Sequence, residues 1–454
     1  MTGTAAEVTD AYLRDERLAA LVAETSFPRA FQDCWGDRML SRPLFVDGEE
    51  LRRTAEDVNA LFTLLGSLPQ RLFDGDTGRY CAELGIAPDR AAVLGRFAAT
   101  GATRYGRADL YHDGSSFKLL EFNVASDLGG TDRSEMQRAL LGHPAFAAFA
   151  AEHGLAHVHT GERIAAALRA AAGPVTGGRE PRVGLVCAPG GLTAFRHLLL
   201  AFASMMRNLG IALELGELDA LTERGDRLHL AGSPVDVVFR FFTVDDLCAD
   251  PAAAARAELA FRAHEEGRAV LWTPMDSSLY SNKGTLALLS DPRLSTAFTP
   301  GERALVGRLL PWTRILAEGP VELDGRETDL LDHCRAHRAE LLLKPLRDFG
   351  GSGITPGWEC DDARWDEALR GCLTAAAAEP GNRWIVQRRV VPRTEPATAP
   401  GTGALTDWVA AWGMFLTPEG YAGTDVRAAP VEASAVVNYG TNPLTRTTGV
   451  FTVG

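Results

Sequence analysis

The chain has 454 residues, of which 46% are hydrophobic and 23% are charged, a balance typical of a globular protein with two or three domains. The formal net charge of −13 disfavours a nucleic-acid partner, because the phosphate backbone repels an acidic surface. No apolar run is long enough to span a bilayer and the N-terminus lacks the pattern of a signal peptide, so we expect a cytoplasmic protein without membrane partners.

The first predicted elements are helices. Residues 10–24 and 49–66 carry apolar side chains at helical spacing, so 1–100 is expected to be a helical N-terminal region. A β-hairpin follows at 102–125. Asp132, with Glu135 three positions later, has the spacing of a capping box and predicts a helix within the next unit, 101–172.

The middle of the chain alternates strand, helix and strand. Residues 173–181 are rich in Pro and Gly and are expected to be a linker, and 182–285 then predicts a parallel α/β domain. This domain lacks a G-x-G-x-x-G pattern, so it gives no support to dinucleotide binding. Residues 286–454 carry further strands, and 393–404, rich in Pro, Gly and Thr, are expected to form a surface loop.

Lys344 ends a predicted strand and is followed by a glycine-rich turn. Four small residues stand six to nine positions after it: Gly350, Gly351, Ser352 and Gly353. Glycines let backbone N–H groups approach phosphate oxygens closely, and the lysine supplies a positive charge. The pattern indicates a phosphate clamp, although an ordinary hairpin turn has the same composition. No G-x-x-x-x-G-K-[ST] occurs, so a P-loop is absent.

Two further segments are candidates for nucleotide binding. Lys283 opens an apolar helix for which Ser281 or Asn282 would be the N-cap. Gln387 and Arg388 follow the apolar letters W-I-V, where an adenine base would find a strand edge and an amide side chain. Taken separately, these features indicate a helix start and a surface turn.

The hairpin carries three candidate metal ligands. Glu121 and Asn123 stand two apart in a strand, so their side chains share a face. Asp109 on the preceding strand joins that face only if paired residue numbers sum to an even number. A loop of three or five residues around 113–115 gives this parity, whereas a strict two-residue Asp-Gly turn does not. A solvated strand face is the alternative interpretation.

The order of these segments resembles the ATP-grasp fold in its glutathionylspermidine-synthase-like, circularly permuted form. That group has Arg-x-Asp and then Glu-x-Asn about a dozen residues later, ahead of two lysines, and this chain has R-A-D at 107–109 and E-F-N at 121–123. The resemblance covers about 100–454. It implies the α/β (α+β) class: an ATP-grasp fold in permuted order, with a parallel pre-ATP-grasp domain at 182–285 and nucleotide-binding lobes at 286–454.

The resemblance also implies a chemistry. Asp109, Glu121 and Asn123 look like ligands of two Mg²⁺ ions that bridge the phosphates of ATP. A substrate carboxylate would attack the γ-phosphate to give an acylphosphate and ADP, and an amine would then displace the phosphate. Arg107 would stabilise charge on the transferred group, and its alternative is an ordinary ion pair with Asp109 or Glu121.

Substrate contacts are expected just after the hairpin. Ser126, Asp127 and Arg133 would recognise an amino or carboxylate group, or else serve in turns and caps. Arg427 would close over the phosphates, and Glu395 would contact the ribose.

We therefore expect a carboxylate–amine ligase that uses ATP and Mg²⁺ in specialised biosynthesis. Its substrates would be small molecules, such as amino acids or peptides, and a homodimer is left open. A kinase-like phosphotransferase and a nucleotide-binding protein without turnover are the alternatives. Hydroxylamine separates the first two, because it traps an acylphosphate as a hydroxamate and does not trap a phosphate ester.

Overall fold

The N-terminal region is helical, as its apolar spacing predicts. The computed structural model describes residues 3–98, 103–347, 350–379, 381–399, 403–433 and 436–454. The helices of the first part are α1 (Ala5–Arg14), α2 (Leu21–Glu24), α3 (Arg29–Trp35), α4 (Gly48–Phe73), α5 (Thr77–Glu83) and α6 (Pro88–Gly95). A short strand among them, β1 (Leu44–Asp47), pairs in parallel with β21 (Val450–Val453), which fastens the N-terminal region to the C-terminal end.

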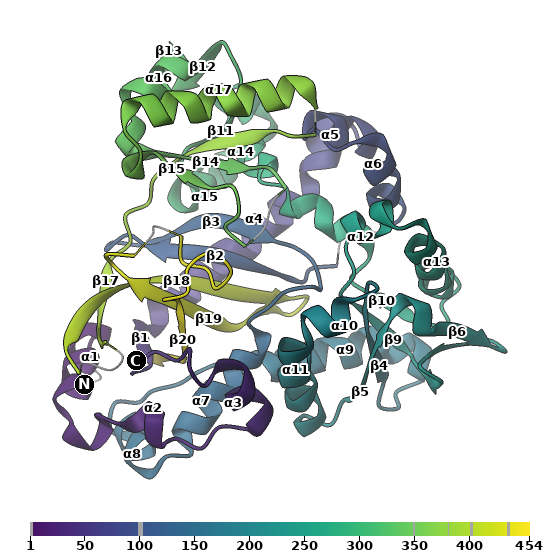
Figure 1. The fold of residues 1–454 in the computed structure, drawn as a ribbon, viewed down its shortest axis with the longest axis vertical. Helices are drawn as coiled ribbons and strands as arrows, with labels where there is room; N and C mark the ends of the chain where they lie inside the picture. The colour runs from purple at the N-terminus through teal and green to yellow at the C-terminus, as the bar shows by residue number, and fades with distance from the viewer. Residues whose placement is uncertain (1–2, 99–102, 348–349, 380, 400–402, 434–435) are drawn as a thin grey trace.

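A six-stranded antiparallel sheet forms the centre of the molecule (Figure 1). Its order is β20-β19-β18-β2-β3, and β17 pairs with β18 beyond the end of β2. The strands are β2 (Gly106–His112), β3 (Phe117–Asn123), β17 (Thr394–Thr398), β18 (Leu405–Thr417), β19 (Gly420–Pro430) and β20 (Arg446–Thr448). The sheet therefore places the hairpin beside strands from the far end of the chain, and the apolar face of α4 packs in the same core.

The structure differs from two of the sequence expectations. Residues 394–398, expected in a surface loop, are a strand, because alternate side chains such as Ala397 are buried against the sheet; 400–402 lie outside the described residues. The expected capping box at Asp132 is also wrong. Helix α7 (Ser134–Leu141) begins two residues later, because Asp132 accepts a hydrogen bond from the Trp35 indole (2.7 Å) and Glu135 pairs with His159 (3.0 Å).

A four-stranded parallel sheet lies between residues 182 and 272. Its order is β10-β9-β4-β5, built from β4 (Arg182–Cys187), β5 (Ala212–Glu217), β9 (Val237–Arg240) and β10 (Val270–Trp272). Helices α9 (Thr160–Thr176), α11 (Arg196–Asn208) and α13 (Pro251–Glu265) pack with it, and β6 (Leu221–Arg224), β7 (Arg227–Leu230) and β8 (Ser233–Pro234) form a small sheet beside it. Because α9 continues through Pro174, the linker expected at 173–181 begins as helix.

The third sheet is antiparallel, in the order β11-β16-β14-β15, and it lies above the central sheet in Figure 1. Its strands are β11 (Thr313–Ile315), β14 (Leu341–Pro345), β15 (Thr355–Pro356) and β16 (Trp384–Arg388). Helices α16 (Leu330–Ala336) and α17 (Asp362–Ala378) cover one face, while Ala287 of α14 (Gly284–Ser290) packs on the other face against Ile385. Because side chains alternate along a strand, Lys344 and Gln387 share this second face.

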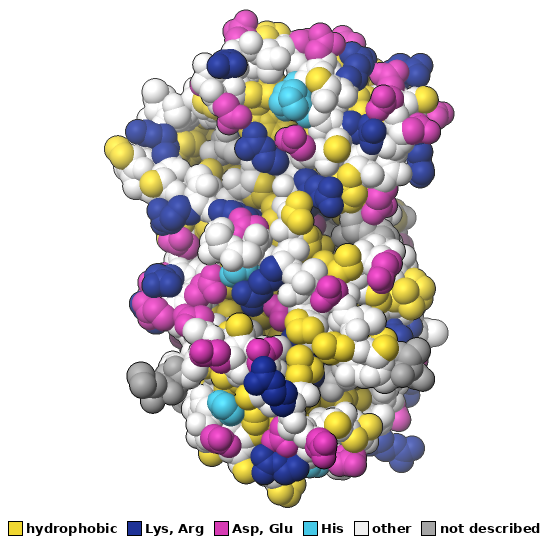
Figure 2. All heavy atoms as spheres, turned by 90° about the vertical axis from the view of Figure 1, so that its left-hand side faces the viewer, with side chains coloured by type: hydrophobic (Ala, Val, Ile, Leu, Met, Phe, Trp, Pro, Cys, Tyr) yellow, Lys and Arg dark blue, Asp and Glu magenta, His cyan; other side chains and the backbone are white. Residues whose placement is uncertain are grey.

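The remaining elements complete these layers. Helices α8 (Pro144–Glu152) and α15 (Pro300–Leu309) add buried side chains to the hydrophobic cores. Helices α10 (Gly191–Ala194) and α12 (Val244–Ala249) belong to the region of the parallel sheet, and β12 (Pro320–Leu323) pairs with β13 (Arg326–Asp329). On the face in Figure 2, acidic and basic side chains are intermingled. Among the described residues, no helix combines the length and hydropathy needed to cross a membrane.

Candidate functional site

The hairpin brings its three candidate ligands together, by a different route from the one expected. Asp109 lies directly opposite Glu121, so the two carboxylates share a face. The loop at 113–116 has four residues and by itself gives the wrong parity. The register shifts where Leu110 pairs with Leu119, which leaves Leu120 without a partner on β2. This β-bulge, rather than an odd-numbered loop, turns Glu121 towards Asp109.

Two arginines hold the Asp109 carboxylate. Arg107 donates from Nε to Oδ1 (2.6 Å) and from Nη2 to Oδ2 (2.9 Å), and Arg427 of β19 donates to Oδ2 (2.7 Å). Gly413 of β18 makes room for this clamp, since a Cβ there would lie 2.8 Å from Cδ of Arg107. Burial raises the pKa of Asp109, but the two guanidinium groups outweigh it and hold that pKa well below the ordinary range.

Glu121 faces a buried lysine. Its Oε2 lies 3.3 Å from Nζ of Lys283, and its Oε1 accepts a hydrogen bond from Asn123 (3.2 Å). Burial raises the pKa of Glu121, while Lys283 and the more distant Lys344 lower it further than burial raises it. Glu121 is therefore ionised at neutral pH. The helix after Lys283 starts with the Asn282 side chain accepting the Gly284 N–H (2.8 Å).

Lys344 reaches the bulge from the third sheet. Its Nζ donates to the Leu120 carbonyl (3.0 Å) and to Oε1 of Gln387 (2.9 Å), whose amide nitrogen donates to Thr313 (3.0 Å). Leu120, which the bulge leaves without a partner on β2, thus supplies the carbonyl that orients the Lys344 ammonium. Burial lowers the pKa of Lys344 to about 8 against the opposing effect of Glu121. Gln387 orients this ammonium through its side chain, rather than offering a free amide to a base.

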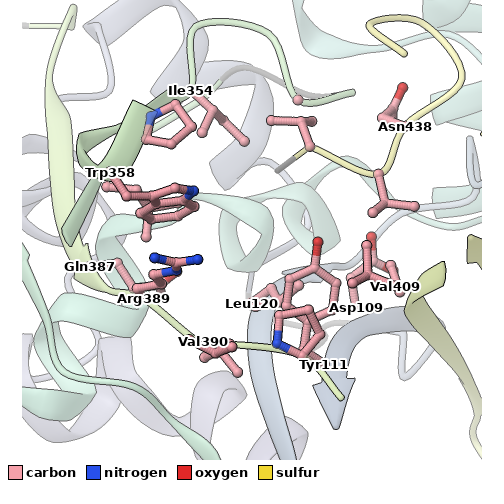
Figure 3. Close-up of a pocket in the computed structure, with 18 of the residues that line it drawn as sticks. Asp109, Tyr111, Leu120, Ile354, Trp358, Gln387, Arg389, Val390, Val409 and Asn438 are labelled. Carbon is pink, nitrogen blue, oxygen red and sulfur yellow. The ribbon is translucent and has the colours of Figure 1, made fainter. Parts of the chain in front are cut away.

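A cavity of about 700 Å³ lies between the central sheet and the third sheet. Figure 3 shows its two walls, with Trp358, Gln387 and Arg389 on one side and Asp109 and Leu120 on the other. The Arg389 guanidinium stacks on the Trp358 ring, 4.1 Å from its centroid. This flat, half-buried surface suits the face of an aromatic base.

The glycine-rich turn borders this cavity. Gly350, Gly351 and Gly353 have φ values of 68°, 78° and 68°, a left-handed conformation that glycine adopts without strain. Gly351 lines the cavity, Ser352 is exposed beside it, and residues 348–349 of the turn lie outside the described ones. Arg388 also lines the cavity and pairs with Asp324 at the surface (3.2 Å).

A second cavity of about 610 Å³ lies on the other side of the carboxylates. It contains Arg107 and Asn123, and it shares Glu121, Arg427 and Asn438 with the first cavity. Its walls come from three parts of the chain that are far apart in sequence: 33–38 of the N-terminal region, 197–198 with 243–245 beside the parallel sheet, and 438–439 near the C-terminus. Sequence reasoning found no role for the N-terminal region, because no motif marks these wall residues.

The expected substrate residues take different positions. Ser126 is buried; it donates to the Arg240 carbonyl (2.7 Å) and accepts from the Thr273 N–H (3.0 Å), so it ties the hairpin to the parallel sheet. Asp127 lines the second cavity.

Arg133 also lines the second cavity, but its guanidinium is already engaged. It pairs with Asp425 and lies between the rings of Trp35 (4.5 Å to the centroid) and Tyr439 (4.8 Å). Glu395 is held in ion pairs with Arg42 (3.2 Å) and Arg393 (2.9 Å).

The donor set fits Mg²⁺ in its chemistry. Two carboxylates and one amide oxygen are hard ligands of the kind that Mg²⁺ takes, with water and phosphate completing the shell. The described residues hold no cluster of three or more His, Cys, Asp or Glu side chains placed for a metal, so phosphate oxygens would have to supply part of the coordination.

No protein-family model matches the chain, and no curated protein matches it. Among solved structures, it is similar to a glutathione synthetase-like effector from Globodera pallida, with 12% identity and a TM-score of 0.56 over 99% of this chain and 98% of that one. The chain shares its fold with this glutathione synthetase-like protein.

A second structure, described as a gamma-glutamylcysteine synthetase from Methylobacillus flagellatus, covers 80% of this chain and 84% of its own at 12% identity. Its TM-score of 0.40 is too low to bear on the fold. The likeness to the effector concerns the fold, and it agrees with the mixed α/β class expected from the sequence. The narrower assignment, to the permuted glutathionylspermidine-synthase-like group, stays a prediction.

Proposed function

We propose that the chain is an ATP-grasp carboxylate–amine ligase that forms an acylphosphate and releases ADP and phosphate. The observation that carries the proposal is the meeting of two cavities at Glu121 and Arg427. A reaction that joins a nucleotide phosphate to a second substrate needs two adjoining sites with the reacting atoms between them.

The charges at the junction favour a polyphosphate. Four cations, Arg107, Arg427, Lys283 and Lys344, surround the two carboxylates Asp109 and Glu121, which leaves an excess of two positive charges. Buried charge that is not balanced is unfavourable. An anionic ligand in the first cavity would supply the missing negative charge.

The chain's residues have separable tasks in the proposed reaction. Trp358 and Arg389 would receive the base, and Lys344 and the glycine-rich turn would hold the phosphates. Asp109, Glu121 and Asn123 would hold Mg²⁺, which neutralises phosphate charge when bound.

The transferred phosphoryl group would come from the first cavity, and the substrate carboxylate would approach from the second. Arg107 lines only the second cavity of the two and Arg427 lines both. Their guanidinium groups would move from Asp109 towards the charge that develops on the transferred group.

Trapping the intermediate tests this proposal. The purified chain is incubated with ATP, Mg²⁺ and a panel of amino acids and short peptides as carboxylates, with primary amines or hydroxylamine as nucleophile. We expect ADP release that depends on the carboxylate, and a hydroxamate when hydroxylamine is present. ADP release without hydroxamate would favour a kinase-like phosphotransferase. Nucleotide binding without ADP release under any condition would reject the ligase.

A further inference from the structure

Asp127 is a carboxylate that lines the second cavity and forms only a long ion pair with a neighbouring arginine. It follows Asn123 by four residues and lines this cavity together with Arg107. Its side chain is 28% exposed. Its Oδ1 atom is buried, however, and accepts no hydrogen bond from the described part of the chain. The nearest cation, Nη1 of Arg240, stands 3.8 Å away, which is too far for a hydrogen bond.

The buried Oδ1 faces Arg240, and the exposed part of the Asp127 side chain is open to the second cavity. Arg240 is fully buried, and its guanidinium already donates to the carbonyls of Phe242 (2.6 Å) and Thr273 (2.9 Å). Asp246 of α12 and the buried Tyr105 are the other titratable groups that interact with Asp127. Burial raises the pKa of the Asp127 carboxyl, Arg240 opposes this rise and Asp246 adds to it. A carboxylate in this setting attracts a proton more strongly than one in water.

The other carboxylates near the reacting centre are committed. Asp109 is held by two arginines and Glu121 faces Lys283. Asp33, Asp37 and Asp245 also line the second cavity, but they are exposed to bulk water.

The proposed reaction needs a proton acceptor on the side of the second cavity. A primary alkyl amine has a pKa of about 10, so at pH 7 almost all of it is ammonium without a lone pair for attack. We propose that Asp127 is the general base that accepts a proton from the amine substrate. This inference rests on the proposed ligase function and adds the residue that makes the nucleophile.

The Asp127 carboxylate binds the ammonium and accepts one proton, which leaves a neutral amine. The amine nitrogen forms a bond to the acyl carbon, the bond from that carbon to the phosphate oxygen breaks, and phosphate leaves with the electron pair. The nitrogen loses a second proton to the departing phosphate. Asp127 then releases the first proton to water, and the amide remains.

Hydroxylamine separates proton removal from all earlier steps, because it is a neutral nucleophile at pH 7 and needs no base before attack. The experiment compares the wild-type chain with Asp127→Asn, which keeps the size of the side chain and removes its negative charge. Both receive ATP, Mg²⁺ and the carboxylate and primary amine that give the highest ADP release in the panel, and then hydroxylamine in place of the amine.

We expect Asp127→Asn to lower kcat for amide formation about 100-fold or more at pH 7, since general bases typically contribute factors of this size. Hydroxamate formation should stay within about threefold of the wild type. The amide deficit should shrink as the pH approaches the pKa of the amine. Asp127→Glu should recover part of the rate. Asp332→Asn, an exposed aspartate on α16, is the matched control and should change neither rate.

Other outcomes overturn the inference. Equal loss of hydroxamate and amide would place Asp127 in acylphosphate formation or in the integrity of the site. A raised KM for the amine with unchanged kcat would make it a binding residue only. Full amide activity in Asp127→Asn would remove any role. If the wild type forms no hydroxamate with any carboxylate, the ligase proposal fails and this inference fails with it.

Discussion

Substituting Asp109 by Asn tests the charge arrangement at the junction of the two cavities. The change keeps the size of the side chain and removes the negative charge that Arg107 and Arg427 share. Both the Asp109 side chain (5% exposed) and the Arg427 side chain (9%) are buried. Removing one partner of a buried ion pair costs about 3–5 kcal/mol, because the remaining charge is left uncompensated. With two guanidinium groups left behind, we expect a loss of unfolding free energy at the upper end of that range.

The effect should depend on pH with a defined sign. The pKa of Asp109 is depressed in the folded chain, so its ionised form stabilises the fold above the unfolded-state pKa of about 3.9. That stabilisation is lost as the pH falls through the folded-state value. The difference between the wild type and Asp109→Asn should therefore be constant between about pH 5 and 7 and shrink below about pH 4.

Urea denaturation followed by tryptophan fluorescence at pH 7, 5 and 4, without metal or nucleotide, measures this difference. Asp332→Asn, which breaks the exposed pair with Arg335, should cost under about 1 kcal/mol. In the double variant Asp109→Asn, Arg427→Gln, removal of the second guanidinium should recover at least about 1 kcal/mol relative to the additive sum. A cost for Asp109→Asn as small as the control, or a double variant that is simply additive, would refute the buried-clamp account.

Three further predictions concern the proposed reaction. Lys344 has a folded-state pKa of about 8, and a bound phosphate would favour its ammonium form. ATP binding should therefore take up a proton above pH 8 and weaken as the pH rises. Calorimetry in buffers of different ionisation enthalpy measures this proton uptake, and Lys344→Met should abolish it. Arg107→Lys should lower kcat about 100-fold or more with little change in ATP affinity, because an ammonium cannot hold two oxygens as a guanidinium does; an unchanged kcat with a raised KM for ATP would make Arg107 a binding residue. Trp358→Leu should weaken ATP binding by about 1–3 kcal/mol and remove the nucleotide-induced fluorescence change, whereas an unaltered Kd would place the base elsewhere.

The sequence indicated much of the local chemistry. The two-residue spacing of Glu121 and Asn123 places both on one strand face whatever the rest of the fold does. The alternation of strand and helix after residue 182 was enough to predict the parallel sheet, since parallel strands need a crossover. Lys344 before a glycine-rich turn marked a second strand with a phosphate-binding composition. These features depend on neighbours within a few residues, which a single sequence displays.

Tertiary structure decided what these pieces do together. The parity between Asp109 and Glu121 depends on the bulge at Leu120, and no residue type announces a bulge in advance. Arg427 on β19 reaches Asp109 on β2 because β18 pairs with both strands and lies between them. The two residues are more than 300 positions apart in the sequence.

The second cavity shows the same limit of sequence reasoning. Its walls come from the N-terminal helices, the parallel sheet and the C-terminal segment, and no local pattern brings these together. Ser126 and Asp127 are neighbours in a polar stretch and look alike as substrate residues. In the described structure, packing against the parallel sheet gives the Ser126 hydroxyl two hydrogen bonds and leaves Oδ1 of Asp127 without one. The sequence determined which chemical groups are present, while long-range packing determined which of them stay available, because hydrogen-bond partners are assigned by the folded chain as a whole.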